Sequence, residues 1–380
     1  MPATTYLSEL SSSTLHALFA AWQAAGVRQC LVLLPEAEAP AISGLQTVCR
    51  DLDLILAGAV FPELLQPGGP TRQGAVLIPL GNCPAPLLLE NVSRPDGVEA
   101  VARRLADHLE THVAEDQDVT LFCIFDALVP NIATHLDAWY LALADRVHYL
   151  GVNAGSETFA PIPCLFDNQR CIADGLLVQF LPGHPGGCLE HRYSVPDRVI
   201  TATSAQGNRI VQIDWRPALE VYSELMREQY GVSIDRDNFY NYAVHFPFGI
   251  LRADGEVLVR IPVALDEAGG IVCVGEIPPN SVLALLDARA TSDQASASLV
   301  RDLQQLMPPP FPDLLLFYCA GRRMHMGPER MAAELAGLQQ SLSTSRIFGA
   351  FSLGEIGSSQ SGGYPLFHNA TLVGMPWLLH

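Results

Sequence analysis

The stretch Leu314-Leu-Leu-Phe-Tyr-Cys319 has the apolar run of a buried strand, and an earlier stretch, Val119-Thr-Leu-Phe-Cys123, matches it. A helical pattern follows each strand, ending near residue 145 in the first copy and covering 329–342 in the second. A glycine-containing turn and a proline-led segment complete each copy: Leu150–Ser156 and Pro163–Asn168, then Phe348–Glu355 and Pro365–Asn369. Four matches in the same order indicate that the chain contains an internal duplication.

The apolar pattern around this repeat predicts an α/β fold with mixed α+β sheets. The first 150 residues alternate helical and strand patterns, which is typical of helices packed on a sheet. Residues 174–290 are instead dominated by strand-like runs that short polar or glycine turns separate. We therefore expect two related halves with a ligand cleft between them, beside the glycine-rich turns, although the glycines would equally fit tight turns between strands.

The clearest division of the chain lies near Asp214–Pro217, where one predicted helix interrupts the series of predicted strands. We expect one domain over residues 1–215 and a second over residues 216–380. The proline-rich segment Pro308–Pro312 predicts a stiff connector inside the second domain.

Composition and charge restrict the classes of partner. With 22 Lys and Arg against 40 Asp and Glu, the formal net charge of −18 repels nucleic-acid phosphates and anionic lipids, so we expect neither nucleic acid nor membrane as a partner. No apolar stretch reaches the roughly 20 residues that cross a bilayer, and the amino terminus lacks the pattern of a secretory signal. Nine scattered cysteines without a C-x-x-C pair favour a reducing compartment, so we expect a cytoplasmic protein.

A series of short motifs runs along residues 50–375. They are Gly58–Pro62, Gly155-Ser156, Pro163–Phe166, Gly207-Asn208, Trp215–Tyr222, Phe246–Gly249, Val274–Pro278, Cys319–Arg322, Gly349–Gly357 and Phe367–Thr371. Each motif alone is weak, but their number and order resemble the FIST family, a group of sensory domains in bacterial signal transduction. The resemblance implies a FIST N-like sensory domain over residues 1–215 and a FIST C-like domain over residues 216–380.

Within that family, the Phe-Pro, Pro-Cys-Leu-Phe and Phe-Pro-Phe-Gly motifs are most similar to the stand-alone nitric-oxide-sensing subgroup. This resemblance implies a haem b cofactor, nitric oxide as the signal, and a histidine kinase regulated in trans. His368 departs from the subgroup, where an aromatic residue is expected, and either supplies a new ligand or argues against the subgroup. Other family members are proposed to sense small molecules such as amino acids, so a haem-free sensor of a polar metabolite stays open.

A haem needs an axial donor, usually an imidazole in an apolar pocket, and three histidines are candidates. His191, our metal-ligand candidate, lies where the resemblance places a histidine before the next strand, with Cys188 as a thiolate alternative. His368 lies beside the glycine turn of the repeat, in the expected cleft, and His325 lies between two methionines. Each also fits an ordinary role, because isolated histidines are more often exposed or hydrogen-bonded inside the fold.

Arg322 and Glu355 are the expected anchors for charged ligand groups. Arg322 directly follows a buried strand, where its planar guanidinium could bind a ligand carboxylate or a haem propionate. Glu355 stands in a Gly-Glu-Ile motif after a strand, which favours ligand anchoring or a structural role. The two could equally pair with each other across the repeat.

Motifs of the common enzyme classes are absent from the sequence. It contains no G-x-S-x-G elbow, no P-loop and no H-E-x-x-H. Nucleophile and base pairs from distant parts of the chain are not excluded by sequence. We therefore expect a sensor and not an enzyme, with an enzyme of unknown reaction as the third hypothesis. The sequence leaves a homodimer open.

Overall fold

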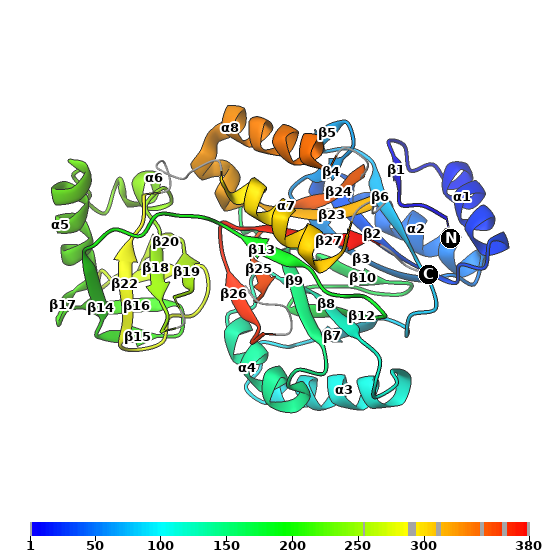
Figure 1. The fold of residues 1–380 in the computed structure, drawn as a ribbon, viewed down its shortest axis with the longest axis horizontal. Coiled ribbons are helices and arrows are strands. Elements are labelled where there is room, and N and C mark those ends of the chain that lie inside the picture. Colours follow the sequence, from blue (N-terminus) through cyan, green and yellow to red (C-terminus); the bar gives the residue numbers. More distant parts are fainter. Residues whose placement is uncertain are drawn as a thin grey trace.

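Apolar strands flanked by amphipathic helices build most of this chain into packed α/β layers. The computed structural model describes residues 2–253, 255–287, 294–308, 313–342, 346–358 and 363–377. Three six-stranded sheets form one body, which we call the prism, and two smaller antiparallel sheets form a second body, which we call the lobe (Figure 1). The prism contains the described residues up to 190 and from 294 onward, and the lobe contains residues 199–287 apart from residue 254.

The first sheet of the prism has the strand order β1-β6-β2-β3-β10-β11. Its strands are β1 (Thr5–Leu7), β6 (Ala75–Leu80), β2 (Gln29–Pro35), β3 (Ile55–Phe61), β10 (Leu165–Asp167) and β11 (Cys171–Ile172). Only β2 and β3 are parallel, and the chain joins them through the 3-10 helix η1 (Glu36–Ala41) and helix α2 (Ile42–Asp51). Helix α1 (Ser12–Ala24) precedes β2 and starts at Ser11, whose hydroxyl accepts a hydrogen bond from the Thr14 amide.

The second and third sheets repeat this order of strands. The second contains β7 (Leu87–Glu90), β12 (Gly175–Pro182), β8 (Val119–Asp126), β9 (His148–Ala154), β25 (Glu355–Gly357) and β26 (Leu366–His368), with helices α3 (Gly97–His112) and α4 (Ile132–Leu143). The third contains β13 (Cys188–Glu190), β27 (Leu372–Trp377), β23 (Asp313–Cys319), β24 (Arg346–Ser352), β4 (Leu64–Gln66) and β5 (Gly69–Thr71), with helices α7 (Gln294–Leu306) and α8 (Ala320–Ser341). In each sheet the third and fourth strands in this order are the parallel pair.

Each sheet is completed by a hairpin that belongs to another repeat. Hairpin β4–β5 follows β3 in the chain but pairs with β24 of the third sheet. Hairpin β10–β11 follows β9 but pairs with β3 of the first sheet. Hairpin β25–β26 follows β24 but pairs with β9 of the second sheet. The repeats thus exchange hairpins cyclically, as three units around a pseudo-threefold axis would. The exchange brings the carboxyl ends of β3, β9 and β24 to the same end of the prism, where backbone hydrogen bonds link each of them to the segment that leads into its borrowed hairpin.

A glycine occupies the same register position in each parallel pair. The pairs are Val32 with Gly58, Cys123 with Gly151, and Leu316 with Gly349. A Cβ on Gly349 would lie 1.8 Å from the carbonyl oxygen of Leu316, and the other two would lie 2.5–2.6 Å from the carbonyl oxygen of their partner. Backbone cannot yield as a flexible side chain can, so only glycine fits where the strands approach this closely.

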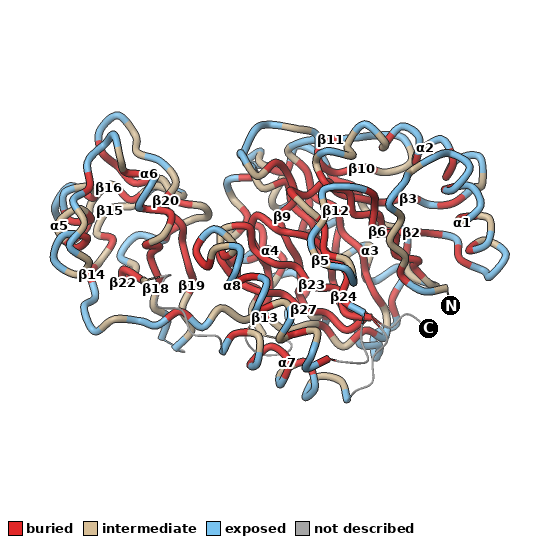
Figure 2. Tube along the Cα trace, turned by 90° about the horizontal axis from the view of Figure 1, so that it is seen from above, coloured by how far each residue is buried: buried red, intermediate tan, exposed pale blue. Residues whose placement is uncertain are grey.

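The prism buries both faces of its sheets, which explains why its long strands are apolar along their length. Helices α1 and α2, α3 and α4, and α7 and α8 pack on the outer faces of the first, second and third sheets (Figure 1). The inner faces meet around one phenylalanine from each repeat: the ring centroid of Phe317 lies 5.9 Å from that of Phe61 and 5.7 Å from that of Phe122. Figure 2 shows the strands of the prism buried and the outer sides of the helices exposed.

The lobe interrupts the third repeat between β13 and α7. Its sheets have the orders β14-β22-β18-β19 and β15-β16-β21-β20, with β17 beside β16. The elements are β14 (Val199–Ala202), β15 (Ser204–Gln206), β16 (Arg209–Ile213), β17 (Arg216–Pro217), α5 (Ala218–Tyr230), α6 (Phe239–Ala243), β18 (Phe248–Leu251), β19 (Val257–Arg260), β20 (Pro262–Leu265), β21 (Ile271–Cys273) and β22 (Ser281–Leu285). Tyr222 of α5 packs against Phe239 and Phe248 in the lobe core, and Gly231 ends α5 in a left-handed conformation, as its position predicts.

The expected α/β fold with mixed sheets and two related halves is confirmed, with two changes in detail. The repeat occurs a third time, in β2, α2 and β3, where the sequence gives no recognisable motif. The two copies also align differently from the expected match of Cys123 with Cys319. Register pairs Cys123 with Gly151 but Leu316 with Gly349, so the structural counterpart of Cys123 is Leu316, three residues earlier.

The remaining expectations about chain organisation concern boundaries and membranes. Residues 214–217 lie inside the lobe, where β16 turns into β17, and the division into 1–215 and 216–380 stays a prediction. Residues 309–312 of the expected connector lie outside the described residues. Within the described parts of the chain, no helix combines the length and the apolar character needed to cross a bilayer.

Candidate ligand-binding cleft

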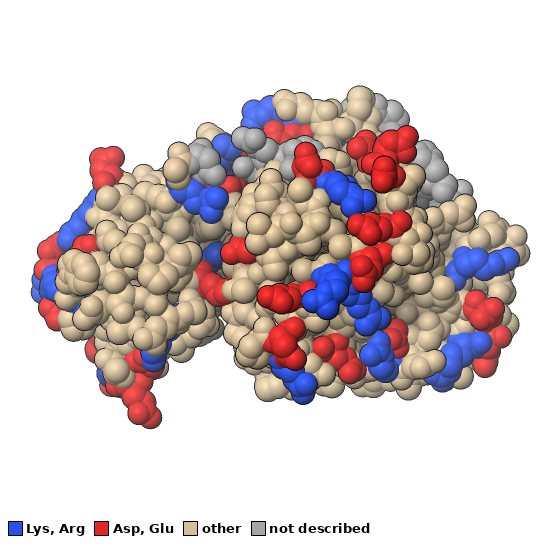
Figure 3. All heavy atoms as spheres, turned by 90° about the horizontal axis from the view of Figure 1, so that it is seen from below, with Lys and Arg blue, Asp and Glu red and all other residues tan. Residues whose placement is uncertain are grey.

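The prism and the lobe enclose a cleft, visible as a groove between the two bodies in Figure 3. Two adjoining cavities lie along it, and both are lined by Arg252, Tyr364 and Leu366. The His368 cavity, of about 500 Å³, also contains His191, Glu256, Val257 and His368 in its wall. The Arg260 cavity, of about 420 Å³, also contains Thr134, Arg260, Glu276 and Phe367. Cavities of this size at a junction between two bodies are typical ligand sites.

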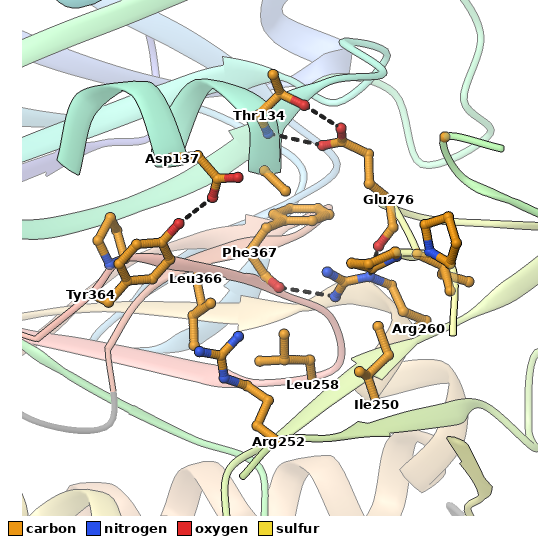
Figure 4. A pocket seen from close by; sticks show the side chains of 16 residues that line it. Thr134, Asp137, Ile250, Arg252, Leu258, Arg260, Glu276, Tyr364, Leu366 and Phe367 are labelled. Carbon is orange, nitrogen blue, oxygen red and sulfur yellow. Dashed lines mark hydrogen bonds between the residues drawn. The ribbon is translucent and has the colours of Figure 1, made fainter. Parts of the chain in front are cut away.

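Polar contacts across the cleft hold the lobe against the prism, and Figure 4 shows those around the Arg260 cavity. The carboxylate of Glu276 accepts hydrogen bonds from the hydroxyl of Thr134, at 2.6 Å, and from its amide, at 3.2 Å. Thr134 is in the first turn of α4, where unpaired amides and the helix dipole favour a carboxylate. On the opposite wall, Nη1 of Arg260 donates to the carbonyl oxygen of Phe367 at 2.9 Å.

His368 is the candidate histidine whose ring remains available. Its side chain is 1% exposed, and neither ring nitrogen has a hydrogen-bond partner among the described residues. A carboxylate oxygen of Glu256 lies 3.9 Å from Nε2, beyond hydrogen-bonding distance. Burial lowers the pKa of His368 well below its usual value, the nearby His191 and Arg260 lower it further, and the backbone of Gly357 opposes the shift. His368 therefore contributes a buried, neutral imidazole to the wall of the larger cavity.

His191 lines the same cavity, but both of its ring nitrogens are occupied. Nε2 lies 3.0 Å from the carbonyl oxygen of Val257, and Nδ1 lies 3.0 Å from the amide of Tyr193, which donates to it. These contacts require Nε2 to carry the proton. Burial lowers the pKa of His191 to about 4. The ring fastens the segment between prism and lobe to β19 and does not present a free nitrogen to a metal.

His325 is occupied in the same way. Its Nε2 contacts the carbonyl oxygen of Val244 in the lobe, and its Nδ1 lies 2.7 Å from the hydroxyl of Tyr193. Burial lowers its pKa to about 3. The flanking methionines differ in exposure, since Met326 is buried and Met324 is 43% exposed. His325 is therefore a hydrogen-bonded histidine inside the fold, which was the ordinary alternative to a ligand role.

Arg322 is held by an ion pair inside the prism, with a partner other than Glu355. The guanidinium binds Glu334 of α8 through two contacts, Nη2 to Oε1 at 2.7 Å and Nε to Oε2 at 3.0 Å. The hydroxyl of Tyr318 donates to the same carboxylate at 2.7 Å, and Nη1 of Arg322 donates to the carbonyl oxygen of His191 at 2.9 Å. The side chains of Arg322 and Glu334 are 0% and 3% exposed, so the charge of Arg322 is neutralised inside the fold and does not face a ligand.

Glu355 is also enclosed within the prism. Its carboxyl group accepts hydrogen bonds from the hydroxyls of Ser352, at 2.5 Å, and Thr371, at 2.7 Å. Complete burial raises its pKa to about 7, because desolvation outweighs these hydrogen bonds. Glu355 therefore fastens the borrowed strand β25 to the start of β27, within the exchange between repeats.

The sequence did not indicate the charged residues that line the cleft. Arg252 and Glu256 lie at the two ends of a turn between β18 and β19, and Arg260 ends the apolar run Val257-Leu-Val-Arg260. A buried cation at the end of an apolar strand is unusual enough to have marked Arg260. Its position facing a cavity depends on the docking of the lobe, which the sequence pattern does not contain.

The side chains around the cleft do not form a multidentate metal site among the described residues. Among the described residues, no group of three or more His, Cys, Asp or Glu side chains could hold a metal ion. Of the three expected haem ligands, His368 has a ring nitrogen available. Comparison with protein families finds the FIST N domain over residues 42–216 and the FIST C domain over residues 218–358. A search of curated proteins gave no match.

Proposed function

Because the chain belongs to the FIST family, whose domains act as sensors in signal transduction, we propose that it is a cytoplasmic sensor that binds its ligand in the cleft between prism and lobe. The ligand-sensing role follows from the family. The observation that supports this location is the His368 cavity of about 500 Å³, whose wall contains a buried imidazole with no hydrogen-bond partner within regular geometry. Buried polar groups are almost always paired, so an unpaired one beside a cavity favours a bound ligand.

We propose haem b as that ligand, with His368 as its axial donor. When bound, a haem iron would supply the site at which nitric oxide is taken up. His368 would hold the group through a neutral ring nitrogen, which its lowered pKa keeps unprotonated at neutral pH. Val257 and Leu366 supply apolar wall, and Arg252 is placed to pair with a carboxylate of the ligand.

The haem-free alternative, a sensor of a polar metabolite, loses the anchors that the sequence suggested for it. Arg322 is bound to Glu334, and Glu355 is bound to Ser352 and Thr371. Haem at His368 is therefore the better supported reading of the His368 cavity.

Replacing His368 by alanine is expected to abolish a stoichiometric Soret band in protein produced with ample haem precursor, because it removes the available axial donor. His191→Ala is the matched control within the same cavity wall, and it should keep the band, since its ring nitrogens are already occupied. Absorption spectra before and after reduction and addition of nitric oxide provide the measurement. Loss of the band in His191→Ala but not in His368→Ala would contradict the assignment of the ligand.

We further propose that the signal passes to a separate histidine kinase, as the resemblance to the nitric-oxide-sensing subgroup implies. Both bodies line the His368 cavity, so a ligand that prefers one relative position of the lobe would shift the population of that position. Nitric oxide is expected to change the rate at which the partner kinase phosphorylates itself only when the sensor is present. The same rate with and without the sensor would exclude that kinase as the partner.

A further inference from the structure

Arg260 is a buried cation without an acidic partner. It lies at the end of β19 and is 2% exposed. Its three hydrogen bonds all go to backbone carbonyl oxygens: Nε to Glu276 at 2.9 Å, and Nη1 to Val259 at 3.0 Å and Phe367 at 2.9 Å. No carboxylate of the described residues forms an ion pair with it, whereas the equally buried Arg322 is bound to Glu334 by two contacts. Charges buried this deeply are normally paired.

The unused part of the guanidinium faces a space large enough for a ligand. Nη2 of Arg260 makes no hydrogen bond to a described residue, and Arg260 lines the Arg260 cavity of about 420 Å³. Burial lowers the pKa of Arg260 to about 10, so the group stays charged at neutral pH. Arg252 lines the same cavity from the neighbouring strand end, which gives the cavity a second guanidinium (Figure 4).

The two acidic side chains in this cavity already have partners on the opposite wall. Glu276 accepts hydrogen bonds from the amide and hydroxyl of Thr134, and Asp137 accepts one from the hydroxyl of Tyr364. The Glu276 carboxylate is directed toward the first turn of α4, whereas Asp137 stands on α4 and its carboxylate is directed toward Tyr364 (Figure 4). Neither carboxylate forms an ion pair with Arg260, although Glu276 is near enough to favour the charged form of the guanidinium, so a ligand carboxylate would supply the direct countercharge that it lacks.

We propose that the Arg260 cavity binds a small monocarboxylate, whose carboxylate pairs with Arg260 and Arg252. The body of the ligand contacts the apolar part of the wall, which is formed by Ile250, Leu258, Ile277, Leu366 and Phe367. A ligand carboxylate can accept a charge-assisted hydrogen bond from Nη2 of Arg260, and the guanidinium of Arg252 lies in the wall of the same cavity. A multiply charged phosphate suits the cavity less, because Asp137 and Glu276 also line it and the formal net charge of the chain is −18.

Calorimetric titration of the full chain with sodium hexanoate at pH 7 tests this site, with 1-hexanol and inorganic phosphate as probes of the apolar and anionic contributions. Hexanoate should bind at one site, and both comparison probes should bind at least about tenfold more weakly. Arg252→Ala should weaken hexanoate binding about tenfold, because it removes one charge-assisted contact at the wall. Arg198→Ala, at an exposed arginine just before β14 that pairs with Glu228 of α5, removes the same charge and should leave binding unchanged.

Two further variants separate binding from folding. Arg260→Met should abolish hexanoate binding, but it also removes three hydrogen bonds of the lobe. Ala133→Leu keeps both arginines and narrows the cavity from α4, so it should weaken binding in a folded protein. Equal binding of hexanol or of phosphate, no binding of hexanoate, or unchanged binding in Ala133→Leu would each overturn the proposal. His368→Ala should leave hexanoate binding unchanged, which keeps this site distinct from the proposed haem site.

Discussion

Glu334→Ala is expected to lower the free energy of unfolding by about 3–5 kcal/mol, because it leaves the buried guanidinium of Arg322 without its countercharge. Arg322 and Glu334 are joined by two hydrogen bonds, and their side chains are 0% and 3% exposed. The same substitution removes the acceptor of the Tyr318 hydroxyl. Removing one partner of a buried pair costs more than the pair itself contributes, since the remaining charge can be solvated only by unfolding or by water entry.

Urea denaturation of a set of variants checks this prediction. Glu329→Ala, on the exposed side of the same helix, is the matched control and should change the free energy of unfolding by less than about 0.5 kcal/mol. The double variant Arg322→Met with Glu334→Leu removes both charges and should recover much of the loss. A loss below about 1 kcal/mol for Glu334→Ala would show that the pair is hydrated and not sealed in the prism.

Stability is expected to fall by about 4 kcal/mol as the pH drops from 6.5 to 5, and buried neutral histidines are the cause. Burial lowers the pKa of His184 and His191 to about 4 and that of His325 to about 3. In the unfolded chain these groups return to a pKa near 6.5. Below that pH the unfolded state therefore binds protons that the folded state does not, and stability decreases.

Buried carboxyl groups with a raised pKa, which are Asp126, Glu190 and Glu355, oppose this decline, and Glu355 opposes it most. Each of the three histidines costs about 1.4 kcal/mol per pH unit below pH 6.5, or about 2 kcal/mol by pH 5, giving about 6 kcal/mol together. Burial raises the pKa of Glu355 to about 7, so its contribution to stability is complete in acid and is lost as the pH rises from its unfolded value of 4.5 toward 7. Over the same interval Glu355 therefore returns about 2 kcal/mol as the pH falls.

Denaturation midpoints and free energies measured at half-unit steps of pH provide the test. His325→Gln should make the decline shallower by about 2 kcal/mol over this interval, whatever its effect at pH 7. Glu355→Gln should make the decline steeper by a similar amount, because it removes the opposing proton uptake. A free energy of unfolding that stays constant from pH 7 to pH 5 would mean that these histidines are hydrated in the folded state.

Much of the architecture was present in the sequence because it depends on local periodicity. The alternation of helices and strands expected in the first 150 residues is present, and α5 is the helix expected after Asp214–Pro217. The duplication was visible because strands β8 and β23 carry the same apolar pattern before similar glycine turns. The third copy was missed because β2, α2 and β3 share the geometry of the repeat without sharing its motifs. The feature that all three repeats share is a glycine in the second strand of the parallel pair, such as Gly58 opposite Val32. It can be recognised only once the pairing register of the strands is known.

The candidate site was determined less by the sequence, because hydrogen-bond partners and cavities come from contacts between distant residues. By their neighbours in the chain, His191 was the preferred metal ligand, and His368 and His325 were the further candidates. Tyr193, 132 residues before His325, and Val257, 66 residues after His191, decide that two of them are occupied. Likewise, Glu334 and not Glu355 binds Arg322, since α8 folds back over the end of β23.

The sequence by itself therefore determined the elements, their order and the sensory family, since apolar spacing and short motifs are properties of neighbouring residues. Only the tertiary structure decided which charges are paired inside the fold and which face the cleft. The desolvation of a side chain depends on everything packed around it, and for Arg260 and His368 those neighbours come from both the prism and the lobe.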